Sequence, residues 1–128
     1  MITLDYSDSR PIYEQIVEKY KLLILKGVLV PDEQMPSVRN LAMEISTNPN
    51  TVQKAFAELE RQGFIYSVKG RGNFVAANPS LLEERKKQIA RELALKFKEA
   101  ASIGIPKGEL LDAVADAEKE LDKEDSHD

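Results

Sequence analysis

The chain has 128 residues, a net charge of −4, no Cys and a single His, His127. This composition excludes disulfides, cysteine or histidine metal clusters and a Ser-His-Asp triad in the body of the chain, so we expect no catalysis, no metal and no cofactor. No apolar run approaches the roughly 20 residues that cross a bilayer, and no signal-peptide pattern is present, which favours a cytoplasmic protein without membrane contact.

The first long element is predicted to be a helix that begins after Pro11 and ends before Gly27. Gly27 suits the left-handed position that often follows a helix. The apolar side of this helix is formed by Ile12, Ile16, Tyr20, Leu23 and Ile24. Residues 2–4 are predicted to form a brief strand, and residues 31–36 a connector whose prolines disfavour helix.

Two shorter amphipathic helices follow, separated by a turn at residues 46–48. Their apolar residues recur every three or four positions, which is the period of one helix face. These residues are Val38, Leu41, Ala42 and Ile45 in one helix and Val52, Ala55, Phe56 and Leu59 in the other. Because the turn is short, both faces must share one core at a steep angle, as in a helix-turn-helix.

The second of these helices presents polar side chains on its outer face. Asn48 is its predicted N-cap, and Pro49 suits its first position. The outer face and its flanks carry Asn50, Thr51, Gln53, Lys54, Ala57 and Arg61. Amides near a helix N-terminus can bond adenine edges in the major groove, and the free N–H groups of the helix end can bind phosphate. An ordinary solvated helix face is the alternative interpretation.

A β-hairpin with a basic tip is predicted directly after these helices. Residues 64–68 and 73–75 are β-prone, and the turn between them consists of Lys69, Gly70, Arg71 and Gly72. Residues 61–75 contain three basic residues and no acidic one. Lys69 and Arg71 can therefore contact phosphate or enter a minor groove, where the glycines let the backbone approach closely. A solvent-exposed turn without function is the alternative.

The charges are unevenly distributed along the chain. Residues 1–78 carry nine Lys/Arg and nine Asp/Glu, whereas residues 79–128 carry nine and thirteen. Residues 36–75 carry five and three, which is a local net charge of +2. Because charges are screened beyond roughly 8 Å at physiological salt, this local field matters more to a nucleic acid than the total charge.

From residue 79 onward the pattern changes to two longer helices. A break at residues 102–108 separates them, and a charged tail, predicted to be disordered, follows from Asp122. Their apolar stripes contain Leu82, Ile89, Leu93 and Phe97 in the first helix and Leu110, Val114 and Leu121 in the second. Two helices of this size cannot bury both stripes alone, so we expect them to form a homodimer interface. Packing back onto the preceding domain is the alternative.

Four segments, in order, resemble the DNA-binding domain of the GntR family of bacterial transcription regulators. They read PIYEQI at residues 11–16, MPSVRNLA at 35–42, NPNTV at 48–52 and GRGNFV at 70–75. The helical part from residue 79 resembles the short two-helix extension of the YtrA subfamily in its length and pattern. The resemblance implies a winged helix-turn-helix that binds duplex DNA, and it implies a repressor.

The family pattern also assigns DNA-contacting positions. Arg39, two residues after the predicted N-cap Ser37, matches an arginine that contacts DNA in this family. Asn50, Thr51 and Gln53 fall on recognition-helix positions. The wing tip of the family is matched by Arg71 and the glycines beside it, Gly70 and Gly72.

Three positions depart from the family pattern. Pro49 and Gln53 stand where some relatives outside the subfamily have base-contacting arginines, so the operators of those relatives do not transfer to this chain. Asp32 stands where many members have glycine, and Asp tolerates the left-handed conformation better than most residues.

The predicted fold class is α+β, mostly α, with a winged helix-turn-helix DNA-binding domain at residues 1–78 and a helical dimerisation extension at residues 79–128. The predicted function is sequence-specific regulation of transcription by a homodimer bound to an inverted repeat in double-stranded DNA. The alternative is a winged-helix module that binds protein or RNA, in which Arg39, Gln53, Lys69 and Arg71 have no shared role. The sequence identifies neither the operator nor a small-molecule effector.

Overall fold

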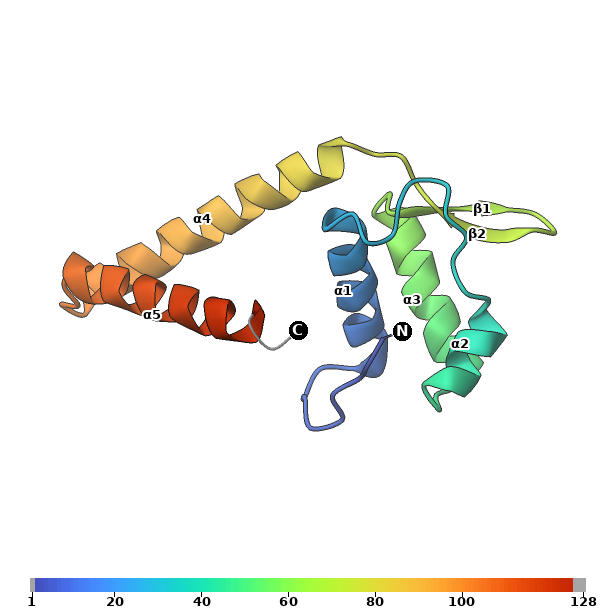
Figure 1. Cartoon of the computed structure of the whole chain (residues 1–128), viewed down its shortest axis with the longest axis horizontal. Helices are drawn as coiled ribbons and strands as arrows, with labels where there is room; N and C mark the ends of the chain where they lie inside the picture. The colour runs from blue at the N-terminus through green and yellow to red at the C-terminus, as the bar shows by residue number, and fades with distance from the viewer. Residues whose placement is uncertain (1, 126–128) are drawn as a thin grey trace. The chain divides into compact units, whose positions relative to one another are not determined.

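The computed structural model describes residues 2–125, which form five helices and one two-stranded antiparallel sheet (Figure 1). In chain order the elements are α1 (Ile12–Leu25), α2 (Val38–Glu44), α3 (Pro49–Arg61), β1 (Ile65–Val68), β2 (Gly72–Val75), α4 (Ser80–Ser102) and α5 (Lys107–Asp125). The chain divides into two compact units, of which the first ends at Glu83 and the second begins at Glu84. This order of helices, hairpin and helices confirms the predicted fold class.

The core of the first unit lies between α1, α2 and α3. Leu41 from α2 and Val52 from α3 are completely buried in it. Tyr20 of α1 and Phe56 of α3 meet edge to face, with 6.0 Å between the ring centroids and 89° between the ring planes. Such contacts stabilise a core beyond the area they bury. Burial raises the pKa of the Tyr20 hydroxyl to about 12, and Ile16 of α1 completes this packing.

The segment before α1 is a loop, so the predicted strand at residues 2–4 is wrong. The alternation of apolar residues that favoured a strand has a different cause, because Ile2 is buried in the core and Leu4 packs against its edge. Both residues anchor the loop through their side chains, and no backbone pairing is formed by residues 2–4.

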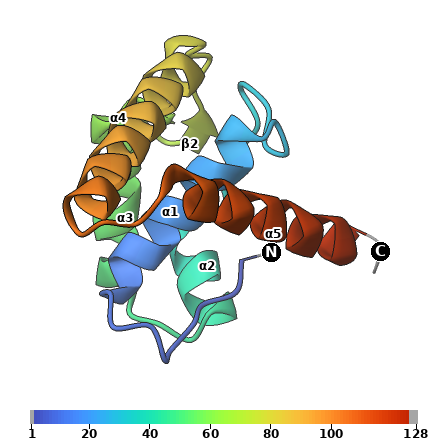
Figure 2. The same cartoon turned by 90° about the vertical axis from the view of Figure 1, so that its left-hand side faces the viewer.

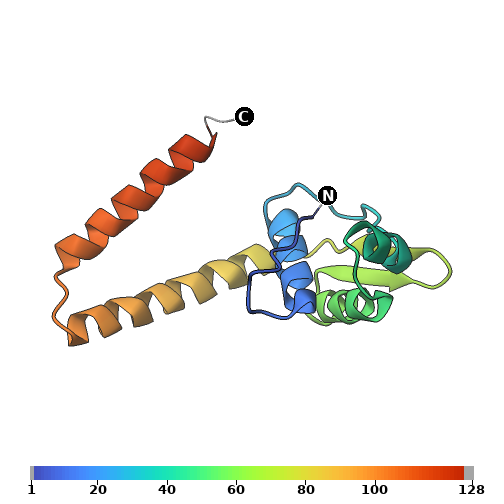
Figure 3. The same cartoon turned by 90° about the horizontal axis from the view of Figure 1, so that it is seen from below.

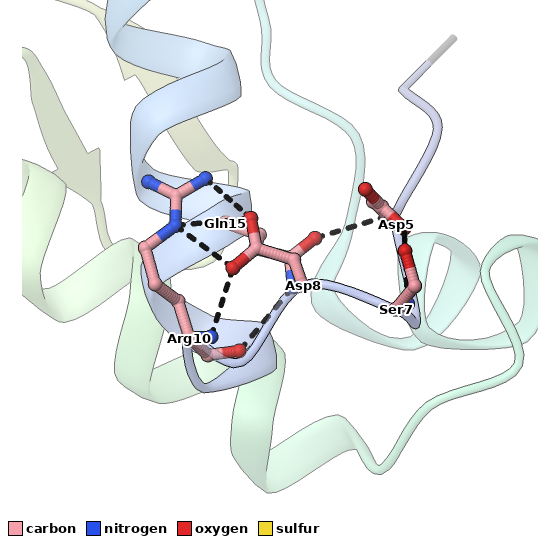
Figure 4. A network of polar contacts seen from close by, with 5 residues as sticks. All are labelled: Asp5, Ser7, Asp8, Arg10 and Gln15. Carbon is pink, nitrogen blue, oxygen red and sulfur yellow. Dashed lines mark hydrogen bonds and ion pairs between the residues drawn. The ribbon is translucent and has the colours of Figure 1, made fainter.

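A polar network holds this loop on α1 (Figure 4). The buried side chain of Gln15 accepts a hydrogen bond from the Asp5 N–H at 3.0 Å and donates one to the Arg10 carbonyl at 3.3 Å. Arg10 also pairs with Asp8, with its Nη2 2.9 Å from Oδ2. This hydrogen bond from Arg10 lowers the pKa of the Asp8 carboxyl. Because Gln15 is satisfied by backbone groups of the loop, burying it fixes the loop conformation.

The turn between α2 and α3 is fixed by backbone conformation and by a distant tyrosine. Ser46 has a φ of 52°, in the left-handed region. The Thr47 N–H donates to the Ala42 carbonyl at 2.9 Å, which closes the end of α2. The hydroxyl of Tyr6, in the loop before α1, donates to the Ile45 carbonyl at 2.9 Å. The N-terminal loop and the helix-turn-helix are thereby joined directly.

The hairpin pairs β1 with β2 in the register Ile65↔Val75, Tyr66↔Phe74, Ser67↔Asn73 and Val68↔Gly72. The connector at residues 31–36 runs beside β2 and lengthens the sheet edge, which its sequence pattern does not indicate. Gln34 forms a β-bridge with Phe74, and the Met35 N–H donates to the Asn73 carbonyl at 2.8 Å. As expected, Asp32 is left-handed, with a φ of 69°.

The second unit consists of most of α4, a short turn and α5. Gly104 in the turn has a φ of 83°, and the Ile105 N–H donates to the Ala100 carbonyl at 3.0 Å. In this unit α4 and α5 diverge from the turn (Figures 2 and 3). α5 continues to Asp125, so the first part of the segment predicted to be disordered is helical, and residues 126–128 lie outside the described residues.

The first turn of α4 belongs with the first unit, because Leu81 packs against its core. The division of functions at residue 78, with DNA binding before it and dimerisation after it, stays a prediction.

Candidate nucleic-acid interface

The N-terminus of α3 is capped as predicted. Asn48 Oδ1 accepts a hydrogen bond from the Asn50 N–H at 2.8 Å, and Pro49 occupies the first helical position. The side chains of Asn50 and Gln53 are exposed, and that of Thr51 is half-buried. Because α3 buries its opposite face in the core, these side chains and the helix end are held rigidly toward solvent.

The N-terminus of α2 is a second capped helix end. The Oγ of Ser37 accepts a hydrogen bond from the Asn40 N–H at 3.1 Å. Arg39 lies in the first turn after this cap, and its side chain is exposed. Figures 1 and 3 show α2 and the hairpin tip on the side of α3 that faces away from α1.

The hairpin tip has the conformation that its glycines predict. Gly70 has a φ of 78° and Gly72 a φ of 114°, while the Arg71 N–H donates to the Val68 carbonyl at 2.9 Å. The side chains of Lys69 and Arg71 are exposed on either side of Gly70.

The connector between α1 and α2 anchors this hairpin from one side. Gln34 Nε2 donates to the Arg71 carbonyl at 3.0 Å. Tyr66 stacks on Phe74, with 5.6 Å between centroids, and its hydroxyl donates to Asp32 Oδ1 at 2.7 Å. This hydrogen bond raises the pKa of the Tyr66 hydroxyl. Side chains of the connector therefore hold both the base and the tip of the wing.

A polar groove lies between the outer face of α3 and the hairpin. It is lined by Gln53, Phe56, Ala57, Glu60, Arg61, Ser67 and Asn73. The Ser67 hydroxyl donates to Glu60 Oε2 at 2.6 Å and lies 2.7 Å from the side-chain oxygen of Asn73. These three residues were not predicted as part of the site, because the strand register that brings Ser67 beside α3 is a tertiary feature.

Lys54 and Arg61, both expected on the outer face of α3, are drawn into local contacts. The Lys54 ammonium lies over the Tyr13 ring of α1, 3.9 Å from its centroid. Lys54 is exposed as expected, and the attraction of a cation to a ring face places its ammonium beside α1. Arg61 pairs with Glu58, and its Nε is 2.9 Å from Oε2.

The pKa of the Glu58 carboxyl falls to about 2, chiefly because Arg61 donates to it and secondly because Gln62 does. Four charged residues predicted to contact DNA are exposed and form no ion pair within the part of the chain that the structure describes, namely Arg39, Lys54, Lys69 and Arg71. Of these four, Lys54 lies over the Tyr13 ring. The positive charge of this surface is thus concentrated at the α2 N-terminus and the wing tip.

The predicted dimerisation residues lie on α4 and α5. Leu110 is half-buried, and the others are exposed, namely Leu82, Ile89, Leu93, Phe97, Val114 and Leu121. No cluster of His, Cys, Asp or Glu among the described residues could hold a metal ion. No helix between residues 2 and 125 combines the length and hydropathy of a membrane span.

Residues 12–75 match the sequence pattern of the family described as "Bacterial regulatory proteins, gntR family". The chain is 46% identical over 95 residues to the HTH-type transcriptional repressor YtrA of Bacillus subtilis, covering 73% of each chain.

Solved structures also resemble this chain. A GntR family transcriptional regulator from Listeria monocytogenes has a TM-score of 0.73 and 35% identity, covering 88% of this chain and 98% of that one. The DNA-binding domain of AraR, in complex with operator ORE1, has a TM-score of 0.51 and 34% identity, covering 58% of this chain and 90% of that one.

Proposed function

Because the chain belongs to the GntR family of bacterial regulatory proteins, we propose that it is a transcription repressor that binds a specific operator in double-stranded DNA as a homodimer. One observation carries this proposal: the capped N-terminus of α3 holds Asn50 and Gln53 exposed beside a glycine-tipped hairpin. A similar solved structure, the DNA-binding domain of AraR, is in complex with an operator.

The exposed amides of α3 supply sequence recognition. Gln53 and Asn50 can form paired hydrogen bonds with adenine edges in the major groove. Thr51 and the capped helix end, with Asn48 and Pro49, contribute the orientation of α3 on the duplex. Ala57 lies one turn after Gln53. Its short side chain does not obstruct the entry of α3 into the major groove.

The basic groups around α3 supply affinity and position. Arg39 at the α2 N-terminus and Lys69 and Arg71 at the wing tip neutralise phosphates, and Arg71 also reaches a narrow minor groove. Gly70 and Gly72 let the wing backbone approach the duplex. Lys54 lies over the Tyr13 ring and must leave it to reach DNA. It is therefore a secondary DNA contact.

The homodimer forms through α4 and α5, since their exposed apolar stripes need a partner surface. A two-fold dimer carries two α3 helices, and two such helices on one face of DNA require half-sites about 10–10.5 base pairs apart or a multiple of this spacing. The operator is therefore an inverted repeat.

This function needs no cofactor and no catalysis, and its target places the protein in the cytoplasm. The proposal includes no small-molecule effector.

Selection of bound duplexes from a random pool tests the proposal. The expected result is enrichment of one inverted repeat, with at least about 10³-fold preference over random duplex in competition at physiological salt. A pool without a shared repeat, together with binding to RNA or protein at equal or higher affinity, would support the winged-helix interaction module instead. The salt concentration must be fixed, because binding to phosphates makes affinity strongly salt-dependent.

A further inference from the structure

One acidic side chain lies in the surface that the proposed function places against DNA. The groove between α3 and the hairpin is lined by Gln53 and Ala57 of α3, by Glu60, and by Ser67 and Asn73 of the two strands. Glu60 is exposed. Because duplex DNA is negatively charged along its whole length, a carboxylate at this place weakens binding unless a base donates a hydrogen bond to it.

The charge of Glu60 is not neutralised by its neighbours. Within residues 2–125 it forms no ion pair. Arg61, the other charged residue that lines the groove, is held by Glu58, with its Nε 2.9 Å from Oε2. The groove therefore presents a carboxylate without a cationic partner, next to an arginine that is already occupied.

The hairpin fixes the direction of this carboxylate. The Ser67 hydroxyl lies 2.6 Å from Glu60 Oε2 and 2.7 Å from the side-chain oxygen of Asn73. A hydroxyl has a single proton, and a carboxylate accepts it more strongly than an amide does, so Ser67 donates to Glu60. Turning the Asn73 amide so that its NH2 group faces Ser67 then satisfies the hydroxyl oxygen as well.

The second oxygen of Glu60 is available to a ligand. Oε1 of Glu60 has no hydrogen bond within the part of the chain that the structure describes. Since the wing holds Oε2, the carboxylate offers Oε1 as a fixed acceptor to whatever enters the groove. An ionised carboxylate has no proton to donate, so it is an acceptor only.

Glu60 is in line with the amide that is proposed to read bases. It lies seven residues after Gln53, which at 100° per residue brings it back to within about 20° of the same side of α3. The rise along the helix axis over seven residues is about 10.5 Å. Ala57 lies between them and exposes only a methyl group. Gln53 and Glu60 are therefore presented in one row.

Of the four bases, cytosine best matches a lone acceptor in the major groove. Cytosine presents only its N4 amino donor there, whereas guanine presents two acceptors and thymine presents an acceptor and a methyl group. Adenine presents an amino donor beside the N7 acceptor, which suits an amide but sets a lone pair against a carboxylate.

Resting on the proposed function, we propose that Glu60 is a specificity-determining residue that accepts a hydrogen bond from the N4 amino group of a cytosine in each half-site. Ser67 is the positioning residue that holds its carboxylate. Because successive bases on one strand are about 3.4 Å apart, a separation of about 10.5 Å places this cytosine about three base pairs from the pair that Gln53 reads.

Base exchange in the selected operator gives the first test, with the full chain. Each cytosine is replaced in turn by deoxyuridine, with adenine opposite, which exchanges the N4 amino group for an oxygen and adds no methyl group. At one cytosine in each half-site, the wild type should bind the exchanged duplex about tenfold or more weakly in competition. Glu60→Ala should reduce this penalty to within about threefold, while the penalties at the other positions stay as in wild type.

Glu60→Gln gives the second test, because it keeps an acceptor for Ser67 and turns an NH2 donor into the groove. This variant should bind the exchanged duplex at least as tightly as the cytosine duplex, since deoxyuridine offers an acceptor at that place. A reversal of base preference is not expected from a residue that only ties α3 to the wing. Thermal unfolding of both Glu60 variants checks that they are folded.

Ser67 is tested by the same measurement. Ser67→Ala leaves the carboxylate in place without its donor, so the cytosine penalty should fall to about threefold. Ser67→Thr keeps the hydroxyl and should keep the wild-type penalty. A wild-type penalty in Ser67→Ala would overturn the positioning role of Ser67.

Glu18→Gln is the matched control. It removes an exposed carboxylate of the same unit on α1, outside the groove between α3 and the hairpin. Its ranking of all exchanged duplexes should be that of wild type. An equal loss of the cytosine penalty in this control would attribute the effect to net charge and overturn the assignment of Glu60.

The proposed function and this inference fail in different ways. A wild-type chain that prefers no duplex over random DNA contradicts the proposed function. A wild-type chain with a preferred operator, in which no cytosine penalty depends on Glu60, contradicts the base contact alone. Uniform weakening of all duplexes by both Glu60 variants would show a tie between α3 and the wing, and uniform tightening would show repulsion of phosphate; either result overturns the inference.

Discussion

At the scale of single residues, the α3 surface contains exposed amide side chains and other side chains that form contacts within the first unit. Asn50 and Gln53 are exposed, while Asn48 uses its side-chain oxygen for the helix cap. Lys54 and Arg61 have partners within the first unit, Tyr13 and Glu58. The amides are therefore the best candidates for base discrimination.

Asn50→Ala and Gln53→Ala should each reduce discrimination between operator variants by roughly 1–3 kcal/mol, with little effect on binding to random duplex. The reason is that each amide is proposed to bond a base edge and not a phosphate. Competition against point-substituted duplexes measures the change. Gln88→Ala on α4, which removes an exposed amide elsewhere, is the control; wild-type ranking of the operator variants by both α3 mutants would disprove their role.

Glu58 makes stability depend on pH in the acid range. Its pKa is about 2 in the folded chain, against an ordinary value of 4.5, because Arg61 and Gln62 donate to the carboxylate. A lowered folded pKa contributes stability that is complete above pH 4.5 and is lost as the pH falls toward 2. Glu58→Gln should thus be less stable than wild type at about pH 7 and equal to it near pH 2, as measured by urea unfolding. A difference that persists unchanged in acid would refute this linkage.

At the scale of elements, the wing is a hairpin held by a connector. Gln34 bonds the Arg71 carbonyl, and Asp32 accepts from Tyr66, so the connector supports both ends of the hairpin. A wing supported in this way can direct its two basic side chains at the duplex without first becoming ordered, which lowers the entropic cost of binding.

Lys69→Ala with Arg71→Ala should weaken binding to all duplexes alike. The slope of log K against log salt should fall in magnitude by about one for each phosphate that is no longer neutralised, and by twice that if both subunits bind. Titrations at several salt concentrations measure the slope. Lys19→Ala with Lys26→Ala removes two exposed charges elsewhere in the first unit as a control; an unchanged slope in the wing variant would exclude the wing from the interface.

The sequence predicted the elements whose causes are local. The spacing of Val52, Ala55, Phe56 and Leu59 predicted a buried face, and all four are buried. The caps at Ser37 and Asn48 and the glycine turn of the wing follow equally from neighbouring residues.

The features that the sequence did not predict depend on partners far along the chain. Tyr6 bonds a carbonyl 39 residues away, and Gln34 bonds one 37 residues away. Ser67 meets Glu60 through the strand register, and Lys54 turns to a ring on another helix. The strand predicted at residues 2–4 is wrong because a loop, like an edge strand, can bury alternate apolar residues, here Ile2 and Leu4.

At the scale of the whole molecule, the two units differ in how many of their apolar side chains are buried. The first contains the buried cluster and can account for its own stability. The second keeps its apolar side chains exposed, so we expect its stability to depend on association with a partner.

A chain that ends at Glu83 should therefore stay folded and become monomeric. It keeps Leu81, which packs on the core, and lacks both long apolar stripes. Its affinity for a full inverted repeat should fall by roughly 10²–10⁴, because the second half-site is no longer bound by a linked partner. Sedimentation velocity and duplex titration measure both effects, with circular dichroism as the check on folding. A truncated chain that still dimerises would assign dimerisation to the first unit.

The hydrogen bond from Tyr6 to Ile45 has a practical consequence for handling the protein. Ile2, four residues earlier, is buried in the same core as the apolar face of α3. The loop before α1 and α3 therefore pack on the same core. A bulky purification tag fused directly ahead of Ile2 will strain this support and alter operator affinity without touching DNA. A tag on the opposite terminus, or a long flexible spacer, avoids that artefact.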